Sequence, residues 1–333
     1  MHGGDVTARI DFSTCVNAYG PAPVVVDAIR AADVAAYPDP RSVGARGAAA
    51  RMWGRPVDEI AFGAGSVELI AAVVAAHVRA GDTVLVPRPA FGEYGRAALL
   101  AGARIVRPAR VPINATGAVA MARAVYAHRP RVAFLATPTN PGGIALSLDE
   151  VRAVADACRA VGTLLVLDQA YDACTAAPLG TPALGGHPAV LHLRSMTKDH
   201  ALAGLRVGFA VGPVPVIAAL ERVRVPWAAS SVAQAAAVAA LSEAAQAHVT
   251  RTLALLRAEA RAIGGNGTTT YSSTHYFLMH VGDAACVRAT LRARAGIAVR
   301  DCRSFGLPAY IRVAARTPPE NAALVAALRS LDV

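Results

Sequence analysis

Short apolar segments alternate with longer alanine-rich segments from about residue 67 to residue 226. The apolar segments predict strands at residues 83–86, 105–106, 132–136, 164–167, 190–193 and 207–211. The segments between them predict helices at residues 67–79, 94–101 and 148–161. This alternation is typical of an α/β fold, a mainly parallel sheet covered by helices, with right-handed connections between parallel strands.

The pattern changes after Pro226. A long alanine-rich helical region runs to residue 263 and is followed by a glycine-rich turn at 264–267. Next come a strand at 276–281, a helix at 285–295, strands at 297–300 and 310–313, and a helix from Pro318. We therefore expect an N-terminal arm (1–35) that joins a smaller α+β C-terminal domain (227–333), and a large domain between them (36–226).

Composition narrows the class of protein. With 54% hydrophobic and 17% charged residues, the 333-residue chain can bury a sizeable core, as expected of a two-lobed soluble enzyme. The net charge of +10 could indicate nucleic acid as a partner, but the arginines are scattered and aromatic residues make up only 5%. The charge instead favours attraction of anionic small-molecule substrates.

The five cysteines are odd in number, widely spaced and never arranged as C-x-x-C. We therefore expect neither a disulfide framework nor a metal site. The expected compartment is a reducing cytoplasm. Residues 1–5 lack the basic-then-apolar pattern of a secretion signal. The longest apolar run, 69–78, is too short to span a bilayer and contains His77, so no membrane partner is expected.

Lys198 is the single lysine among 33 basic residues; the other 32 are arginine. Such a bias suggests that a position which keeps lysine needs a property that guanidinium lacks. A desolvated ε-amino group can lose its proton and condense with an aldehyde to a Schiff base, whereas arginine stays protonated. Lys198 is therefore the first candidate for a covalent catalytic role.

The surroundings of Lys198 suit a phosphorylated aldehyde. Ser195 lies three residues before it and Arg206 eight after it, which supplies a neutral donor and a fixed cation for a phosphate. The predicted strand 164–167 ends in Asp168, and Tyr171 follows three residues later. An aspartate at a strand end can pair with a pyridine nitrogen, so these residues together indicate pyridoxal 5'-phosphate.

Further segments of the chain match those of a known family and occur in the same order. They are Asp11-Phe12-Ser13 with Asn17, Tyr37-Pro38-Asp39-Pro40, residues 63–70, residues 87–94, residues 137–143, the Asp168 and Lys198 segments, Pro226-Trp227, and residues 299–302 with 310–313. Over nearly its whole length the chain resembles the fold-type-I pyridoxal-phosphate enzymes of aminotransferase class I/II. The nearest branch contains histidinol-phosphate aminotransferase and threonine-phosphate decarboxylase.

The resemblance implies a role for each matching residue. Lys198 would hold the cofactor and then move the proton between substrate and cofactor, while Asp168 would pair with the ring nitrogen. Tyr171 would hydrogen-bond the ring oxygen and Tyr37 would reach the cofactor phosphate of a second subunit, which implies a homodimer with a shared active site. The implied cofactor-binding set is Gly65, Ser66, Phe91, Asn140, Asp168, Tyr171, Ser195, Lys198, Arg206 and Tyr37.

Four residues are candidates for substrate binding. Arg312 matches the family arginine that forms a bidentate pair with the substrate carboxylate. Asn17 would assist in binding that carboxylate. Arg300 could bind a distal phosphate or second acid, or could be a solvated surface residue. His275 could contact the substrate or be structural.

The sequence leaves the substrate and the reaction open. Cys15, Ala64, Val67 and His275 depart from the residues that are usual in this branch. Transamination of an amino acid or related amine, with or without a phosphate, is the favoured hypothesis, and decarboxylation of a phosphorylated amino acid is the alternative. A non-catalytic regulator is less favoured because the cofactor residues are all retained and no DNA-binding extension is present.

Overall fold

The computed structural model describes residues 3–109, 112, 115–264 and 270–331. Seven strands form the larger sheet, in the order β2 (Ile60–Gly63), β8 (Gly208–Val211), β7 (Val190–Ser195), β6 (Leu164–Asp168), β5 (Val132–Ala136), β3 (Thr83–Leu85) and β4 (Arg104–Val106). Only β8 runs antiparallel to its neighbours. The predicted mainly parallel α/β sheet is confirmed, and β2 is a strand that the sequence pattern did not reveal.

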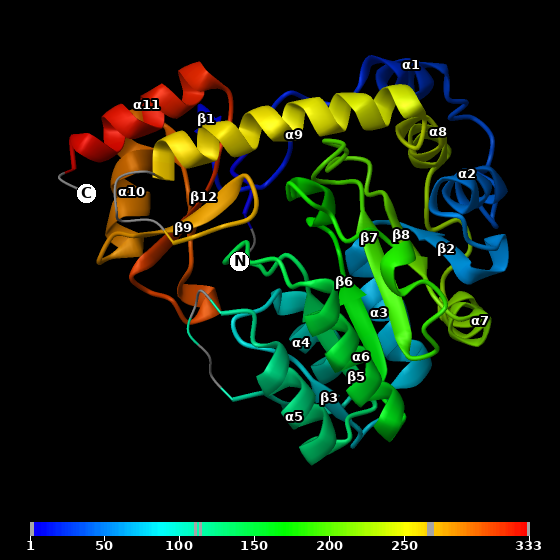
Figure 1. Cartoon of the computed structure of the whole chain (residues 1–333). Coiled ribbons are helices and arrows are strands. Elements are labelled where there is room, and N and C mark those ends of the chain that lie inside the picture. The colour runs from blue at the N-terminus through cyan, green and yellow to red at the C-terminus, as the bar shows by residue number, and fades with distance from the viewer. Residues whose placement is uncertain (1–2, 110–111, 113–114, 265–269, 332–333) are drawn as a thin grey trace.

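Helices cover both faces of this sheet (Figure 1). Side chains alternate between faces along β6, where Val166 packs on one side while Leu165 and Leu167 pack on the other. The Val166 face is covered by α3 (Ser66–His77), α4 (Gly92–Leu100) and α7 (Val214–Val223). The opposite face is covered by α5 (Ala118–His128), α6 (Leu148–Val161), α2 (Val43–Trp53) and α8 (Ser231–Ala240), and α1 (Pro23–Ala31) packs on α8.

The ends of α6 show why its predicted bounds were correct. Ser147 accepts a hydrogen bond from the backbone N–H of Glu150, and the Glu150 side chain accepts one from the backbone of Ser147 in return. Gly162 ends the helix at φ 75°, a conformation that glycine adopts without strain. Helices α1, α2, α5 and α7 were not predicted. All four lack both an acidic first turn and a side-chain N-cap hydrogen bond.

A smaller sheet forms near the C-terminus, in the order β11 (Arg300–Asp301), β12 (Tyr310–Ala314) and β9 (Tyr276–His280). It packs with α10 (Ala284–Ala295) and α11 (Pro318–Arg329). The predicted single strand 297–300 is instead two: β10 (Ile297–Ala298) pairs with N-terminal β1 (Ile10–Asp11), and β11 belongs to the smaller sheet. The N-terminal segment therefore returns to this part of the molecule.

The alanine-rich region after Pro226 is two helices, α8 and α9 (Glu243–Gly264), which residues 241–242 separate. Figure 1 shows α9 crossing from α1 and α8 to the smaller sheet. Helix α8 packs in a cluster with Ile60 and Phe209 of the larger sheet. The domain boundaries at 35/36 and 226/227 remain predictions, and residues 265–267 of the predicted turn lie outside the described residues.

Short 3-10 helices lie at Val57–Glu59, Asp172–Cys174, Pro182–Leu184 and Arg303–Phe305. None of the helices in the described part of the chain combines the length and apolar character needed to cross a bilayer.

Candidate active site

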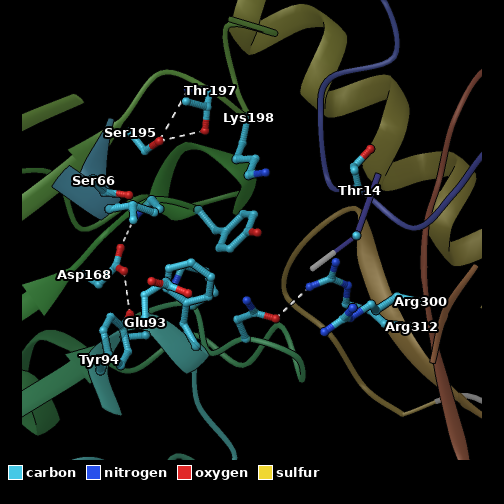
Figure 2. A pocket seen from close by; sticks show the side chains of 18 of the residues that line it. Thr14, Ser66, Glu93, Tyr94, Asp168, Ser195, Thr197, Lys198, Arg300 and Arg312 are labelled. Carbon is cyan, nitrogen blue, oxygen red and sulfur yellow. Dashed lines mark hydrogen bonds between the residues drawn. The ribbon is translucent and has the colours of Figure 1, made fainter. Parts of the chain in front are cut away.

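A cavity of about 430 Å³ opens at the carboxyl ends of the parallel strands, where loops from several strands converge. Asp168 ends β6 and Ser195 ends β7, so both side chains reach the same edge. The smaller sheet closes the other side with Arg300 and Arg312 (Figure 2). The other predicted residues that line the cavity are Ser66, Phe91, Asn140, Tyr171, Lys198 and Arg206.

Lys198 extends into the cavity from the loop after β7. Burial lowers the pKa of its amine, and the charges of Arg312 and Arg206 lower the pKa further. Its backbone carbonyl accepts a hydrogen bond from the Asn17 N–H at 2.8 Å. The backbone of Lys198 is thus held in place and its amine is easier to deprotonate, as a Schiff-base lysine requires.

Asp168 is held by Tyr94, which belongs to the predicted helix 94–101 and to the segment 87–94 but had no predicted role in the site. The Tyr94 hydroxyl donates to Asp168 Oδ2 at 2.5 Å, and the Ala170 N–H donates to Oδ1 at 2.9 Å. The Tyr94 ring stacks on Phe134 with centroids 4.6 Å apart and planes 7° apart. Burial raises the pKa of Asp168, and the hydrogen bonds from Tyr94 and Ala170 oppose that rise.

The turn between β2 and α3 forms a cradle with Arg206. Gly65 has φ 82°, and a Cβ on it would lie 2.6 Å from Arg206 Nη2. A Cβ on Gly208 would meet the backbone of Gly65 and Ser66 at 2.7 Å. Arg206 itself has φ 60°, an uncommon conformation for a bulky residue. A helix N-terminus, a guanidinium and a close-fitting glycine turn together suit a phosphate.

Hydroxyl groups continue this cradle. Ser195 Oγ lies 2.8 Å from Thr197 Oγ1. Both residues line the cavity on the side of Ser66 (Figure 2). Thr197 was not predicted, although it stands between two residues that were.

Two arginines face the cradle from the smaller sheet. Arg312 donates to Asn140 Oδ1 and to the Ser13 carbonyl, each at 2.7 Å, and its Nε is buried without a partner among the described residues. Arg300 is the register partner of Arg312 across β11 and β12 and donates to Ser304 Oγ at 3.0 Å. Both arginines are at least nine-tenths buried. The cavity wall therefore carries two neighbouring cations.

Four predicted residues are not among those that line the cavity. Gly65 is one of them, although it is the N-cap of α3 and directly precedes Ser66, which does line it. The Asn17 amide donates to the Asp199 carbonyl and to Thr252 Oγ1, behind Lys198. His275 is fully buried, and burial lowers its pKa to about 4, so the ring is neutral. Tyr37 is 83% exposed and its ring lies 5.1 Å from that of Trp227.

Other lining residues were missed. Thr14 and Glu93 border the cavity besides Tyr94 and Thr197. Glu93 and Tyr94 belong to the segment 87–94 that carried the resemblance, so their position was available from sequence although their role was not.

The chain belongs to the family of class I and II aminotransferases, whose profile matches residues 8–328. Histidinol-phosphate aminotransferase of Halorubrum lacusprofundi is 33% identical over 319 residues, which cover 95% of this chain and 86% of the relative. The structure of histidinol-phosphate aminotransferase from Sinorhizobium meliloti in complex with pyridoxal-5'-phosphate has a TM-score of 0.88 at 26% identity, covering 98% of this chain and 92% of that chain.

L-threonine-O-3-phosphate decarboxylase from Porphyromonas gingivalis is similar in fold, with a TM-score of 0.85 at 21% identity and coverage of 97% of this chain and 99% of that chain. The fold is therefore shared by enzymes that break different bonds. The family and the cavity residues define this protein as a pyridoxal-phosphate-dependent aminotransferase. Lys198, Asp168 and the cradle around Gly65 fit the aldehyde, ring nitrogen and phosphate of that cofactor.

Proposed function

We propose that this aminotransferase acts on an amine or amino acid that carries a second, anionic group, with histidinol phosphate as the first candidate. The observation that carries the proposal is the pair of buried arginines on β11 and β12. Like charges directly opposite each other in a sheet destabilise it. The hydrogen-bond partners of Arg300 and Arg312 among the described residues are neutral, so an anionic ligand is the natural counter-charge.

Pyridoxal 5'-phosphate, when bound, supplies a carbonyl that captures the substrate amine and a ring that withdraws electrons from Cα. Lys198 would hold the cofactor through its amine, and the same amine would serve as the base that moves a proton at the substrate Cα. Asp168 would pair with the ring nitrogen, and the Tyr94 hydrogen bond favours its ionised form by opposing the rise in pKa that burial causes. These roles of individual residues are part of the proposal.

Two residues would orient the ring. Tyr171 borders the cavity and its own ring lies 4.8 Å from that of Tyr276. Asn140 accepts from Arg312, which links the ring side of the cavity to the carboxylate side. Phe91 lines the cavity next to Tyr94, and the planes of the two rings are 85° apart. Phe91 would stack on the cofactor ring.

A homodimer that shares its active sites is the second part of the proposal. Tyr37 and Trp227 form an exposed aromatic pair, and Trp227 has φ 55°, an uncommon backbone conformation for a bulky residue. Exposed aromatic pairs are typical of protein interfaces. In a symmetric dimer the same pair from each subunit could reach the other subunit's cradle. We place the enzyme in the cytoplasm because its free cysteines suit a reducing compartment.

The substrate proposal is tested on purified holoenzyme with histidinol phosphate, histidinol and O-phosphothreonine. We expect amino transfer from histidinol phosphate with a much lower KM than from histidinol, and no release of CO2 from O-phosphothreonine. Arg300→Ala should raise KM for the phosphorylated amine and leave KM for histidinol unchanged. Equal effects on both amines, or CO2 release as the main reaction, would contradict the proposal.

The shared site is tested by mixing Tyr37→Ala and Lys198→Ala proteins, neither of which should be active alone. A hybrid dimer contains one site with both native residues, so activity should return after subunit exchange. No return of activity in a mixture that sedimentation shows to contain dimers would exclude a shared site.

A further inference from the structure

A second cavity of about 910 Å³ adjoins the active site. It shares three lining residues with the cofactor cavity: Gly3, Ser13 and Arg300. The two cavities therefore meet at Arg300, whose side chain borders both. We call this second space the Arg288 chamber; its other charged lining residues are Asp5, Arg288, Arg292, Asp301 and Arg303.

The chamber carries more positive than negative charge. Arg292 is paired with Asp5 at 2.8 Å, and Arg303 is paired with Asp301 at 2.7 Å. These two ion pairs use both acids that line the chamber. The guanidinium groups of Arg288 and Arg300 are left without an acidic partner among the described residues.

Arg288 differs from the surface arginines of the chain. Its Nε is buried and has no hydrogen-bond partner within the described part of the molecule. Arg288 lies one turn before Arg292 on α10, so both side chains project from one face of the helix into the chamber. A buried N–H that lacks a partner costs free energy, and a bound oxyanion would remove that cost.

We propose that the Arg288 chamber is an extension of the substrate site that takes the anionic tail of a long substrate. The tail passes Arg300 and ends on the Arg288 guanidinium, while the amino group remains at Lys198. Two uncompensated cations favour a dianion such as a phosphate or phosphonate. This inference rests on the proposed function, since it names the class of substrate for the same site.

The test uses L-amino acids that end in a phosphonate on side chains of increasing length, and methyl-ended analogues of the same lengths. Dissociation constants are measured on holoenzyme from the change in cofactor absorbance and, independently of turnover, by titration calorimetry. We expect Arg288→Gln to weaken the longest phosphonates by about tenfold or more, the effect of losing a charge-assisted hydrogen bond. The shortest phosphonates and all methyl-ended analogues should bind as before.

Arg294→Gln is the matched control, because Arg294 is exposed on the same helix and does not line the chamber. It removes the same charge from α10 and should change no dissociation constant. Ala289→Glu is a second variant that leaves Arg288 in place and adds a carboxylate to the chamber wall. It should weaken the same long phosphonates, and it keeps the test decisive if Arg288→Gln does not fold.

Unchanged affinity of the long phosphonates in both chamber variants, or an equal loss at every length, would overturn the proposal. The outcome is separable from that of the proposed function. If wild-type enzyme transfers amino groups but shows no dependence on Arg288, only the chamber is wrong. If it binds long phosphonates through Arg288 and transfers no amino group, the chamber stands and the proposed function fails.

Discussion

Removal of the Tyr94 hydroxyl tests whether its hydrogen bond favours the ionised form of Asp168. In Tyr94→Phe the ring can still stack on Phe134, so the packing is preserved. The change removes the 2.5 Å hydrogen bond to Asp168 Oδ2 and leaves that oxygen buried. A hydrogen bond to a charged group is worth about 1.5–3 kcal/mol, and about 1.4 kcal/mol corresponds to a factor of ten. We expect kcat to fall by about tenfold to a hundredfold.

The pH dependence gives this expectation a direction. Burial already raises the pKa of Asp168, and the Tyr94 hydrogen bond lowers it, so losing that bond raises the pKa further. In the proposed role of Asp168 the carboxylate is the active form, and a carboxylate predominates above its pKa. The acid limb of kcat against pH should therefore move to higher pH in Tyr94→Phe, because the carboxylate is lost earlier as the pH falls.

The fall in kcat and the shift of the acid limb are both measured by steady-state kinetics of the holoenzyme between about pH 5 and pH 9. Tyr126→Phe is the control, since that tyrosine is 57% exposed and its loss should change neither kcat nor the profile. The reasoning would be refuted if Tyr94→Phe bound a full complement of cofactor, kept kcat within about twofold of wild type and showed no shift of the acid limb.

Three further expectations follow from the cavity. Borohydride should fix the cofactor to wild-type protein but not to Lys198→Ala, as mass spectrometry of the peptides would reveal; fixation in the variant would exclude Lys198 as the anchor. Burial lowers the pKa of Lys198 from 10.5, so the charged amine destabilises the folded cofactor-free protein at pH 7. Cofactor-free Lys198→Met should therefore have a higher thermal midpoint than wild type at pH 7, and this gain should shrink as the pH rises toward 10.5. A difference in midpoint that stays constant with pH would contradict this. Alanine at position 65 would be strained at φ 82°, and its Cβ would clash with the Arg206 guanidinium. Gly65→Ala should therefore weaken cofactor binding by about tenfold or more in equilibrium dialysis. Unchanged affinity would show that this turn does not bind the phosphate.

The sequence alone determined the fold class and the chemistry of the cofactor. Alternation of apolar and alanine-rich segments indicates the parallel sheet because strand and helix periods are local properties of the chain. Lys198 and Asp168 stood out for similar reasons: a lone lysine and an aspartate at the end of an apolar strand are visible without any knowledge of contacts. Residues at the carboxyl ends of adjacent strands must then meet at one edge of the sheet.

Tertiary structure decided the contacts between segments that are distant along the chain. The Tyr94 hydrogen bond to Asp168 joins positions 74 residues apart, and that of Arg312 to Asn140 joins positions 172 apart. No local pattern encodes such pairs. The predicted strand 297–300 was divided between two sheets for the same reason, since its pairing partners lie near residues 10 and 312. Local periodicity therefore specifies secondary-structure elements, while packing determines which side chains contact one another in the cavity.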